Sequence, residues 1–219
     1  MDGEKSVSIA VVRRLPRYYR YLSELLDNGV IRISSKELSE RMNVTASQIR
    51  QDLNCFGGFG HQGYGYNVVD LYKEIGTILG VPVKFNTIII GAGNMGQAIA
   101  KYENFAGRGY NFKAMFDINK KIVGTVINGL KVYHIDDLEN YIKGQSVDVA
   151  VICIPKKDTK EMARRAAALG VKGIWNFSSV DLHDEEEKYG LVVENVHLSD
   201  SLMVLGYRML KNRKGDNIL

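Results

Sequence analysis

The stretch Phe85-Asn86-Thr87-Ile88-Ile89-Ile90-Gly91-Ala92-Gly93-Asn94-Met95-Gly96-Gln97-Ala98 decides the fold of the larger part of the chain. A β-branched apolar run ends in Gly91-x-Gly93-x-x-Gly96 and passes straight into a helix predicted over 97–105. In such a turn the first glycine permits the sharp bend, the second lets backbone approach a pyrophosphate, and the third lets the helix pack on the strand. The pattern predicts a dinucleotide site; a purely structural glycine turn is the alternative, because the chain has 22 glycines.

Strand and helix signals alternate along the rest of this part. The sequence predicts strands over 112–116, 130–132, 147–154 and 172–175, and helices over 136–141 and 159–169. This rhythm predicts an α/β fold in which a doubly wound parallel sheet forms a Rossmann domain.

Ligands of such sheets bind at the carboxyl ends of the strands. Asp117 ends the strand over 112–116 and would bind a ribose 2′-hydroxyl, which favours NADH and NAD+; the nearby Lys120 and Lys121 could instead accommodate a 2′-phosphate. The predicted cofactor contacts are Gly91, Ala92, Gly93, Asn94, Met95, Gly96, Asp117, Ile118, Ile154, Pro155, Asn176, Phe177 and Ser178.

A helix-turn-helix is predicted ahead of the sheet. Ser34 with Glu37, and Thr45 with Gln48, have the spacing of two capping boxes, separated by a turn at Asn43-Val44. The second helix buries an apolar stripe and turns a polar face outward, with side chains of the kind that hydrogen-bond base edges and phosphates. The predicted DNA contacts on it are Thr45, Ser47, Gln48, Arg50, Gln51 and Asn54.

The segments on either side of these two helices extend this prediction. The preceding helix carries Arg13, Arg14, Arg17 and Arg20, which form either a solvated basic face or phosphate contacts. Residues 57–66 interleave glycines with aromatics and predict a hairpin, the wing of a winged helix. Its predicted DNA contacts are Phe59, Gly60, His61, Gly63 and Tyr64. Asn67 and Asp70 begin a further helix, and residues 80–84 form a linker.

Composition narrows the class of protein. The chain has 219 residues, 45% hydrophobic and 25% charged, with a net charge of +4, as is ordinary for a globular protein. Cys55 and Cys153 are far apart and lack metal-ligand spacing, so we expect no metal site. No signal peptide and no apolar run of about 18 residues is visible, so we expect a cytoplasmic protein without a membrane span.

The last predicted helix covers 199–211, with Ser199 as its cap and Leu202, Leu205, Met209 and Leu210 on one stripe. Its apolar side must cover the sheet or cross to a second subunit. We therefore expect a winged-helix domain over 1–80, a Rossmann domain over 85–198 and a terminal helix over 199–219. Tyr207 and Lys211 match the Tyr-x-x-x-Lys spacing of short-chain dehydrogenases, but the glycine pattern differs from that family, so we interpret the match as coincidence.

The whole combination resembles the Rex family of bacterial redox-sensing repressors. The resembling segments are Arg50-Gln51-Asp52-Leu53-Asn54-Cys55-Phe56-Gly57, Gly63-Tyr64-Gly65-Tyr66, Gly91-Ala92-Gly93-Asn94-Met95-Gly96, Phe116-Asp117, Trp175-Asn176-Phe177 and Val193-Glu194-Asn195-Val196. The resemblance implies a homodimer with exchanged terminal helices that binds palindromic operator DNA when free or NAD+-bound and releases it when NADH closes the dimer.

The resemblance also implies a switch between the domains, with Arg20 and Tyr102 at its positions. Where the family often has an aspartate, this chain has His197, which could make the switch sensitive to pH. The chain shows no evident catalytic apparatus, so we expect a regulator and not an enzyme. The alternatives are a small NAD-dependent oxidoreductase, which would turn over its cofactor, and a regulator that binds coenzyme A or another nucleotide.

Overall fold

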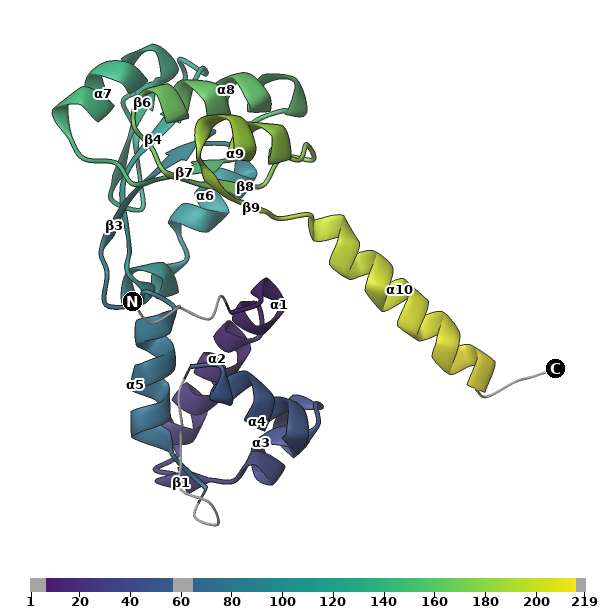
Figure 1. The fold of residues 1–219 in the computed structure, drawn as a ribbon. Helices are drawn as coiled ribbons and strands as arrows, with labels where there is room; N and C mark the ends of the chain where they lie inside the picture. The colour runs from purple at the N-terminus through teal and green to yellow at the C-terminus, as the bar shows by residue number, and fades with distance from the viewer. Residues whose placement is uncertain (1–6, 57–64, 216–219) are drawn as a thin grey trace. The chain divides into compact units, whose positions relative to one another are not determined.

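The computed structural model describes residues 7–56 and 65–215 and divides the chain into two compact units, Met1–Val83 and Lys84–Leu219 (Figure 1). The N-terminal unit holds α1 (Ile9–Val12), α2 (Leu15–Asp27), α3 (Ser35–Met42), α4 (Ala46–Asn54) and α5 (Val68–Ile78). A two-stranded antiparallel sheet joins β1 (Arg32–Ile33) to β2 (Tyr66–Asn67). Each unit has its own apolar core.

The helix-turn-helix is confirmed as α3 and α4. Asn43, with φ of 52°, ends α3 in the left-handed conformation that asparagine tolerates and so turns the chain into α4. Both helices bury their predicted apolar residues in one core that α2 and α5 complete; it includes Leu15, Tyr18, Leu22, Leu38, Met42, Ile49, Leu53, Leu71 and Ile75. Strand β1 was not predicted, because two residues carry too little pattern to be recognised.

The C-terminal unit is built on a seven-stranded sheet in the order β5-β6-β4-β3-β7-β8-β9. Its strands are β3 (Phe85–Ile90), β4 (Tyr110–Asp117), β5 (Val126–Ile127), β6 (Leu130–His134), β7 (Val149–Ile152), β8 (Gly173–Asn176) and β9 (Val192–Asn195). All neighbouring pairs are parallel except β5 with β6. The six parallel strands have the order of a Rossmann fold, which confirms the predicted class.

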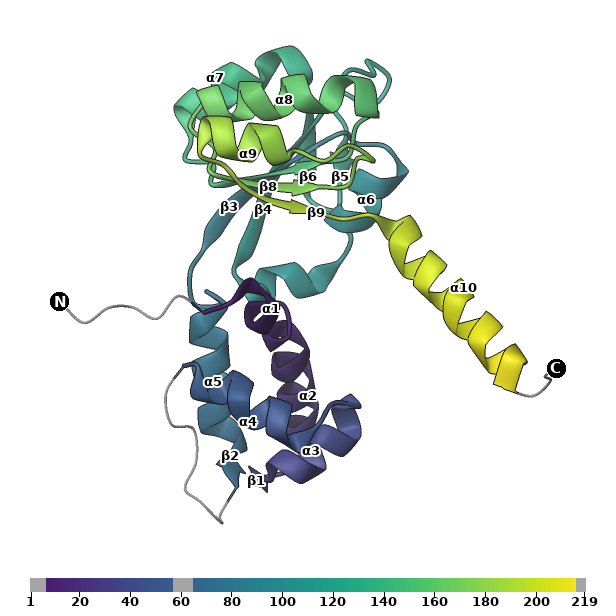
Figure 2. The same cartoon turned by 45° about the vertical axis from the view of Figure 1, so that its right-hand side comes forward.

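Helices cover both faces of this sheet, as Figure 2 shows. Ile88 and Ile90 point into the core under α7 (Leu138–Gly144) and α8 (Lys156–Ala168). Ile89, between them, points to the opposite core with α6 (Asn94–Ala100). Strand β3 is therefore buried on both sides, which is why its sequence is continuously apolar.

Several helix bounds differ from the prediction. Helix α6 begins at Asn94, because Gly93 is extended and serves as the N-cap, and it ends at Ala100 instead of 105. A separate 3-10 helix, η1 (Glu103–Arg108), follows and ends at Gly109, with φ of 90°. Helix α9 (His183–Tyr189) was missed because it is short and almost entirely charged.

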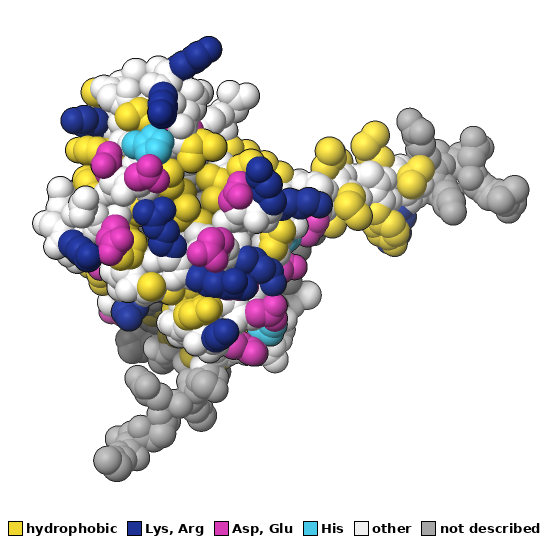
Figure 3. All heavy atoms as spheres, turned by 90° about the horizontal axis from the view of Figure 1, so that it is seen from above, with side chains coloured by type: hydrophobic (Ala, Val, Ile, Leu, Met, Phe, Trp, Pro, Cys, Tyr) yellow, Lys and Arg dark blue, Asp and Glu magenta, His cyan; other side chains and the backbone are white. Residues whose placement is uncertain are grey.

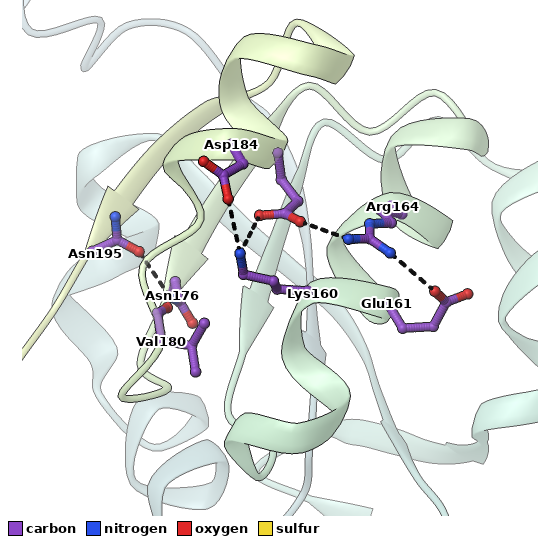
Figure 4. A network of polar contacts seen from close by, with 8 residues as sticks. Lys160, Glu161, Arg164, Asn176, Val180, Asp184 and Asn195 are labelled. Atoms are coloured by element: carbon purple, nitrogen blue, oxygen red, sulfur yellow. Dashed lines mark hydrogen bonds and ion pairs between the residues drawn. The ribbon is translucent and has the colours of Figure 1, made fainter.

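Ion pairs fasten α9 to α8 (Figure 4). Lys160 Nζ lies 3.0 Å from Asp184 Oδ2, and Arg164 Nη2 lies 3.1 Å from Oε1 of Glu185, whose side chain is 2% exposed. The 3-10 helix η2 (Ile135–Asp137) precedes α7 on the same face, and Arg165 donates to the Ile135 carbonyl at 3.2 Å. A buried carboxylate needs such partners, so these pairs explain how the charged α9 packs against α8.

Helix α10 (Leu198–Gly215) exposes an apolar surface on several sides, visible as yellow side chains in Figure 3. Leu202 is 68% exposed and Leu205 50%. The side chains that are also at least half exposed are Met203, Val204, Tyr207, Met209 and Leu210. The helix begins at Leu198, so the predicted cap at Ser199 is wrong. A helix that is apolar on several sides belongs in a buried environment.

Candidate dinucleotide site and DNA-recognition surface

The three glycines of the loop after β3 have different surroundings. Gly91 has φ of +101°, and a Cβ there would overlap the carbonyl oxygen of Cys153, just after β7. A Cβ on Gly96 would overlap the carbonyl oxygen of Gly91, whereas one on Gly93 would meet nothing within 4 Å in the described chain. Gly91 and Gly96 are therefore required by the protein's own packing, and the backbone at Gly93 is open to a ligand.

Asp117, the last residue of β4, braces this loop. Its Oδ2 accepts a hydrogen bond from the Ala92 backbone N–H at 2.7 Å, and its Oδ1 accepts one from the Asn119 N–H at 2.8 Å. Gln97 of α6, which sequence reasoning missed, donates to the Ala92 carbonyl at 2.9 Å. Each carboxylate oxygen has a further acceptor site, so Asp117 can still accept from ribose hydroxyls.

The other predicted cofactor residues lie at neighbouring strand ends. A Cβ on Gly91 would lie 3.0 Å from the side chain of Ile154, and Ile152 of β7 pairs with Asn176 of β8. Of the predicted set, the exposed residues are Gly93, Asn94, Ile118 and Pro155, the half-buried ones Met95, Asp117, Ile154 and Phe177, and the buried ones Gly91, Ala92, Gly96, Asn176 and Ser178.

Asn176 is fully buried and already uses its side chain within the protein. Its Nδ2 donates to the Val180 carbonyl at 2.6 Å and to Asn195 Oδ1 at 2.8 Å (Figure 4). Its Oδ1 accepts from the Ser178 N–H at 3.0 Å. Ser178 Oγ in turn accepts from the Thr159 hydroxyl at 2.8 Å. These polar contacts fix the turn at the carboxyl end of β8. Asn176 and Ser178 are buried, and Phe177 between them is half-exposed.

The predicted recognition helix, α4, presents the expected polar face. Thr45, Ser47, Arg50, Gln51 and Asn54 are exposed, and Gln48 is half-buried. The guanidinium of Arg50 donates to Ser35 Oγ of α3 at 3.0 Å. The predicted wing contacts Phe59, Gly60, His61, Gly63 and Tyr64 lie outside the described residues.

Asp52 of α4 anchors this helix to α2, which the sequence did not reveal. Arg14 reaches both of its carboxylate oxygens, from Nε at 2.6 Å and from Nη2 at 2.7 Å, and the hydroxyl of Tyr18 donates to it at 2.8 Å. Burial acts to raise the pKa of Asp52, but hydrogen bonds from Arg14, Tyr18 and Gln48 outweigh it and lower that pKa. Burial and the same bond to Asp52 raise the pKa of Tyr18.

One of the two predicted capping boxes is incomplete. Ser34 and Glu37 form theirs in both directions. Thr45 accepts from the Gln48 N–H at 3.1 Å, but the Gln48 side chain donates to Asp52 Oδ1 at 2.8 Å and does not return to the cap. A capping box would use only the amide oxygen of Gln48 as an acceptor, whereas Asp52 gives its N–H a charged partner, which makes the stronger hydrogen bond.

The arginines of the first helix have separate roles. Arg14 pairs with Asp52, and Arg17 donates to the Met42 carbonyl at the end of α3. The guanidinium of Arg20, a predicted switch residue, lies over the ring of Tyr21 at 5.6 Å. The basic face is thus partly structural.

The other two predicted switch residues lie in the C-terminal unit. Tyr102 is 53% exposed, and its ring packs at 4.8 Å from that of Phe105. His197, directly before α10, places Nε2 at 2.8 Å from Asp181 Oδ1. The hydrogen bond to Asp181 raises the pKa of His197, against a smaller effect of burial, and Asp200 adds to the increase.

This geometry predicts a pH-dependent contact at the start of α10. Because the pKa of His197 is raised in the folded chain, the ion pair is fully formed below the ordinary value of about 6.5 and is lost as the pH rises through the folded value. In a proton NMR titration, the His197 ring should titrate above 6.5, and Asp181→Asn should lower its pKa.

The effect of this contact on DNA release can be measured with His197→Asn as the control. The resemblance to the Rex family implies that NADH releases DNA, and this release, titrated from pH 6 to 8, should change with pH more in the parent chain than in His197→Asn. Equal pH profiles for the two chains would show that protonation of His197 does not act on the switch.

Other chemistry is sparse in the described ranges. Residues 7–56 and 65–215 contain no group of three or more histidine, cysteine or acidic residues that could hold a metal ion. None of the helices in those ranges is long and apolar enough to cross a membrane. Cys55 is exposed, and burial raises the pKa of the half-buried Cys153 thiol to about 12, which disfavours the nucleophilic thiolate form.

A helix-turn-helix joined to a Rossmann unit with an acid-braced glycine loop defines the class of DNA-binding regulators that carry a nucleotide-binding domain. Family models agree on both halves: "Putative DNA-binding protein N-terminus" matches residues 6–54, and "CoA binding domain" matches residues 82–180. Several similar curated proteins are named redox-sensing transcriptional repressor Rex. That of Clostridium novyi is 53% identical over 94% of this chain and 97% of its own length; that of Caldanaerobacter subterraneus is 52% identical over 100% and 98%.

Solved structures give the same result. The Rex-family repressor RSP in complex with β-NADH is 49% identical, with a TM-score of 0.87 over 97% of this chain and 98% of that one. RSP in complex with β-NAD+ and operator DNA is 52% identical, with a TM-score of 0.85 over 97% and 99%. The chain belongs to the Rex family of redox-sensing transcriptional repressors.

Proposed function

We propose that this chain is a homodimeric repressor that binds palindromic operator DNA when free or NAD+-bound and releases it when NADH binds. The observation that carries the proposal is the union, in one chain, of the exposed polar face of α4 with the glycine loop braced by Asp117. A ligand shifts the balance between two states only through its different affinity for them, so NADH must favour the released state. RSP, solved with NADH and with NAD+ and operator DNA, supports this reading.

The contacts of the proposed sites follow from the geometry. The open backbone at Gly93 would take the pyrophosphate, and Asp117 the ribose hydroxyls. The exposed residues of α4 would contact the major groove, with Arg50 on a phosphate. We propose Phe177 and Ile154 for the far end of the cofactor, and a shaping role for the buried Asn176 and Ser178.

We further propose a cytoplasmic regulator without catalytic turnover, whose domains follow the bounds 1–80, 85–198 and 199–219. The exposed apolar surface of α10 supports exchange of this helix between subunits. Arg20, Tyr102 and His197 would adjust the switch between the two states.

Fluorescence anisotropy tests the function directly. A labelled palindromic duplex, selected from random DNA, is titrated with protein and then with NADH, NAD+ or coenzyme A. We expect release by NADH, reversal by excess NAD+ and little effect of coenzyme A. DNA binding that ignores both NAD forms would overturn the redox reading, and steady oxidation of NADH would favour an oxidoreductase.

Replacing Asp117 by alanine should weaken NADH binding. Hydrogen bonds to a charged acceptor are worth about 1.5–3 kcal/mol each, so the loss should be on the order of ten- to a hundredfold in Kd. Isothermal titration calorimetry measures this loss, with Asp27→Asn in the other unit as the control. Unchanged NADH affinity in Asp117→Ala would place the ribose elsewhere.

A further inference from the structure

The amide of Gln48 is held in one orientation. Its Nε2 donates to Asp52 Oδ1 at 2.8 Å, four residues further along α4. Asp52 is 1% exposed and also accepts from Arg14 and Tyr18. Because an ionised carboxylate can only accept hydrogen bonds, the amide must turn its nitrogen inward.

This contact changes what Gln48 can offer to a base. A free glutamine amide has two N–H donors and one acceptor oxygen. It can therefore offer one donor and one acceptor to adenine N7 and N6, or both donors to guanine N7 and O6. With one N–H bound to Asp52, one donor and the oxygen remain, and that pair matches adenine but not guanine.

We propose that Asp52 is a positioning residue that restricts Gln48 to reading adenine in the major groove. The inference rests on the proposed DNA-binding function and adds the base that one side chain selects. Gln48 lies in the first turn of α4, where recognition helices contact base edges. Arg14 and Tyr18 alone already join α4 to α2, so the bond to Gln48 is an addition to that anchor.

The test measures base preference along the operator. Anisotropy titrations use duplexes in which each base pair of both half-sites is replaced in turn. Gln48→Met identifies the position that Gln48 reads, because preference should flatten there and nowhere else. At that position the parent chain should prefer adenine to guanine by on the order of tenfold.

Asp52→Asn should move this preference toward guanine. Arg14 Nε and the Tyr18 hydroxyl, which donate to the same oxygen of Asp52, claim the one amide oxygen of the new side chain. Its N–H groups then take the place of the other oxygen, facing Gln48 and Arg14 Nη2. The Gln48 amide then turns its oxygen inward and its two N–H groups outward. Tyr18→Phe, which removes one bond to Asp52 and none to Gln48, should keep the preference for adenine.

The outcomes distinguish a failure of the proposed DNA-binding function from a failure of the proposed role of Asp52. If the parent chain binds no specific DNA, the proposed function fails. If it binds, and Asp52→Asn keeps the parent's preference at the Gln48 position, the inference about Asp52 is wrong.

Should Asp52→Asn fail to fold, base analogues test with the parent chain whether Gln48 pairs with both N6 and N7 of adenine, as the proposal requires. Purine lacks the N6 donor and 7-deazaadenine lacks the N7 acceptor, so each should weaken binding of the parent chain, and neither should weaken Gln48→Met. Sensitivity of the parent chain to only one analogue overturns the proposal.

Discussion

Replacing Gly96 by alanine should abolish NADH binding and destabilise the C-terminal unit. The new methyl group would overlap the carbonyl oxygen of Gly91, which is backbone and cannot swing aside. Overpacking of this kind costs about 1–3 kcal/mol or more, and here the displaced atoms belong to the nucleotide loop itself. Thermal unfolding followed by circular dichroism, together with calorimetric titration of NADH, measures both effects.

Gly93→Ala is the matched control, three residues away in the same loop. Its methyl group would meet no described atom within 4 Å, and Gly93 has no positive φ. We therefore expect a nearly unchanged Tm but weaker NADH binding, because the methyl group enters the space proposed for the pyrophosphate. Equal losses of stability in the two variants would contradict the division of roles between these glycines.

The double substitution Leu202→Glu and Leu205→Glu should convert the dimer into a monomer. Both leucines are at least half exposed in the single chain, and we propose that the partner subunit buries them. Each buried leucine contributes about 1.5–3 kcal/mol, and two-fold symmetry counts each one twice. The dimer Kd should therefore rise at least about a thousandfold.

Analytical ultracentrifugation at several concentrations measures this change. Asn212→Glu, which adds one negative charge at an exposed position of α10 where the double substitution adds two, is the control and should remain dimeric. Circular dichroism should show that the monomer keeps its helices and sheet. A dimer that survives the double substitution would show that α10 is not the main contact between subunits.

Local sequence patterns predicted the parts of the fold whose causes are local. The spacing of Gly91, Gly93 and Gly96 follows from a strand, a turn and a helix that are contiguous in the chain, and Asp117 was predicted because it ends the next strand, β4. The box of Ser34 and Glu37 spans one turn and was predicted for the same reason.

Contacts between distant residues could not be predicted in this way. Asp52 lies beside the buried Ile49 and Leu53, but its partner Arg14 is 38 residues away, so nothing local shows that the carboxylate is buried. The side chain of Gln48 donates to Asp52 and does not complete the capping box with Thr45. Helix α9 has too few apolar residues for a helical period and depends on Lys160 and Arg164 of α8.

The bonds around Asn176 have a mechanical consequence. The side chain of Asn176 ties the turn at Val180 to Asn195, the Val196 N–H donates to the Asn176 carbonyl at 2.8 Å, and Asp181 holds His197. These hydrogen bonds therefore connect the turn after β8 to the residues that lead into α10. We therefore expect a ligand that displaces the turn after β8 either to move His197, at the start of α10, or to break one of these bonds.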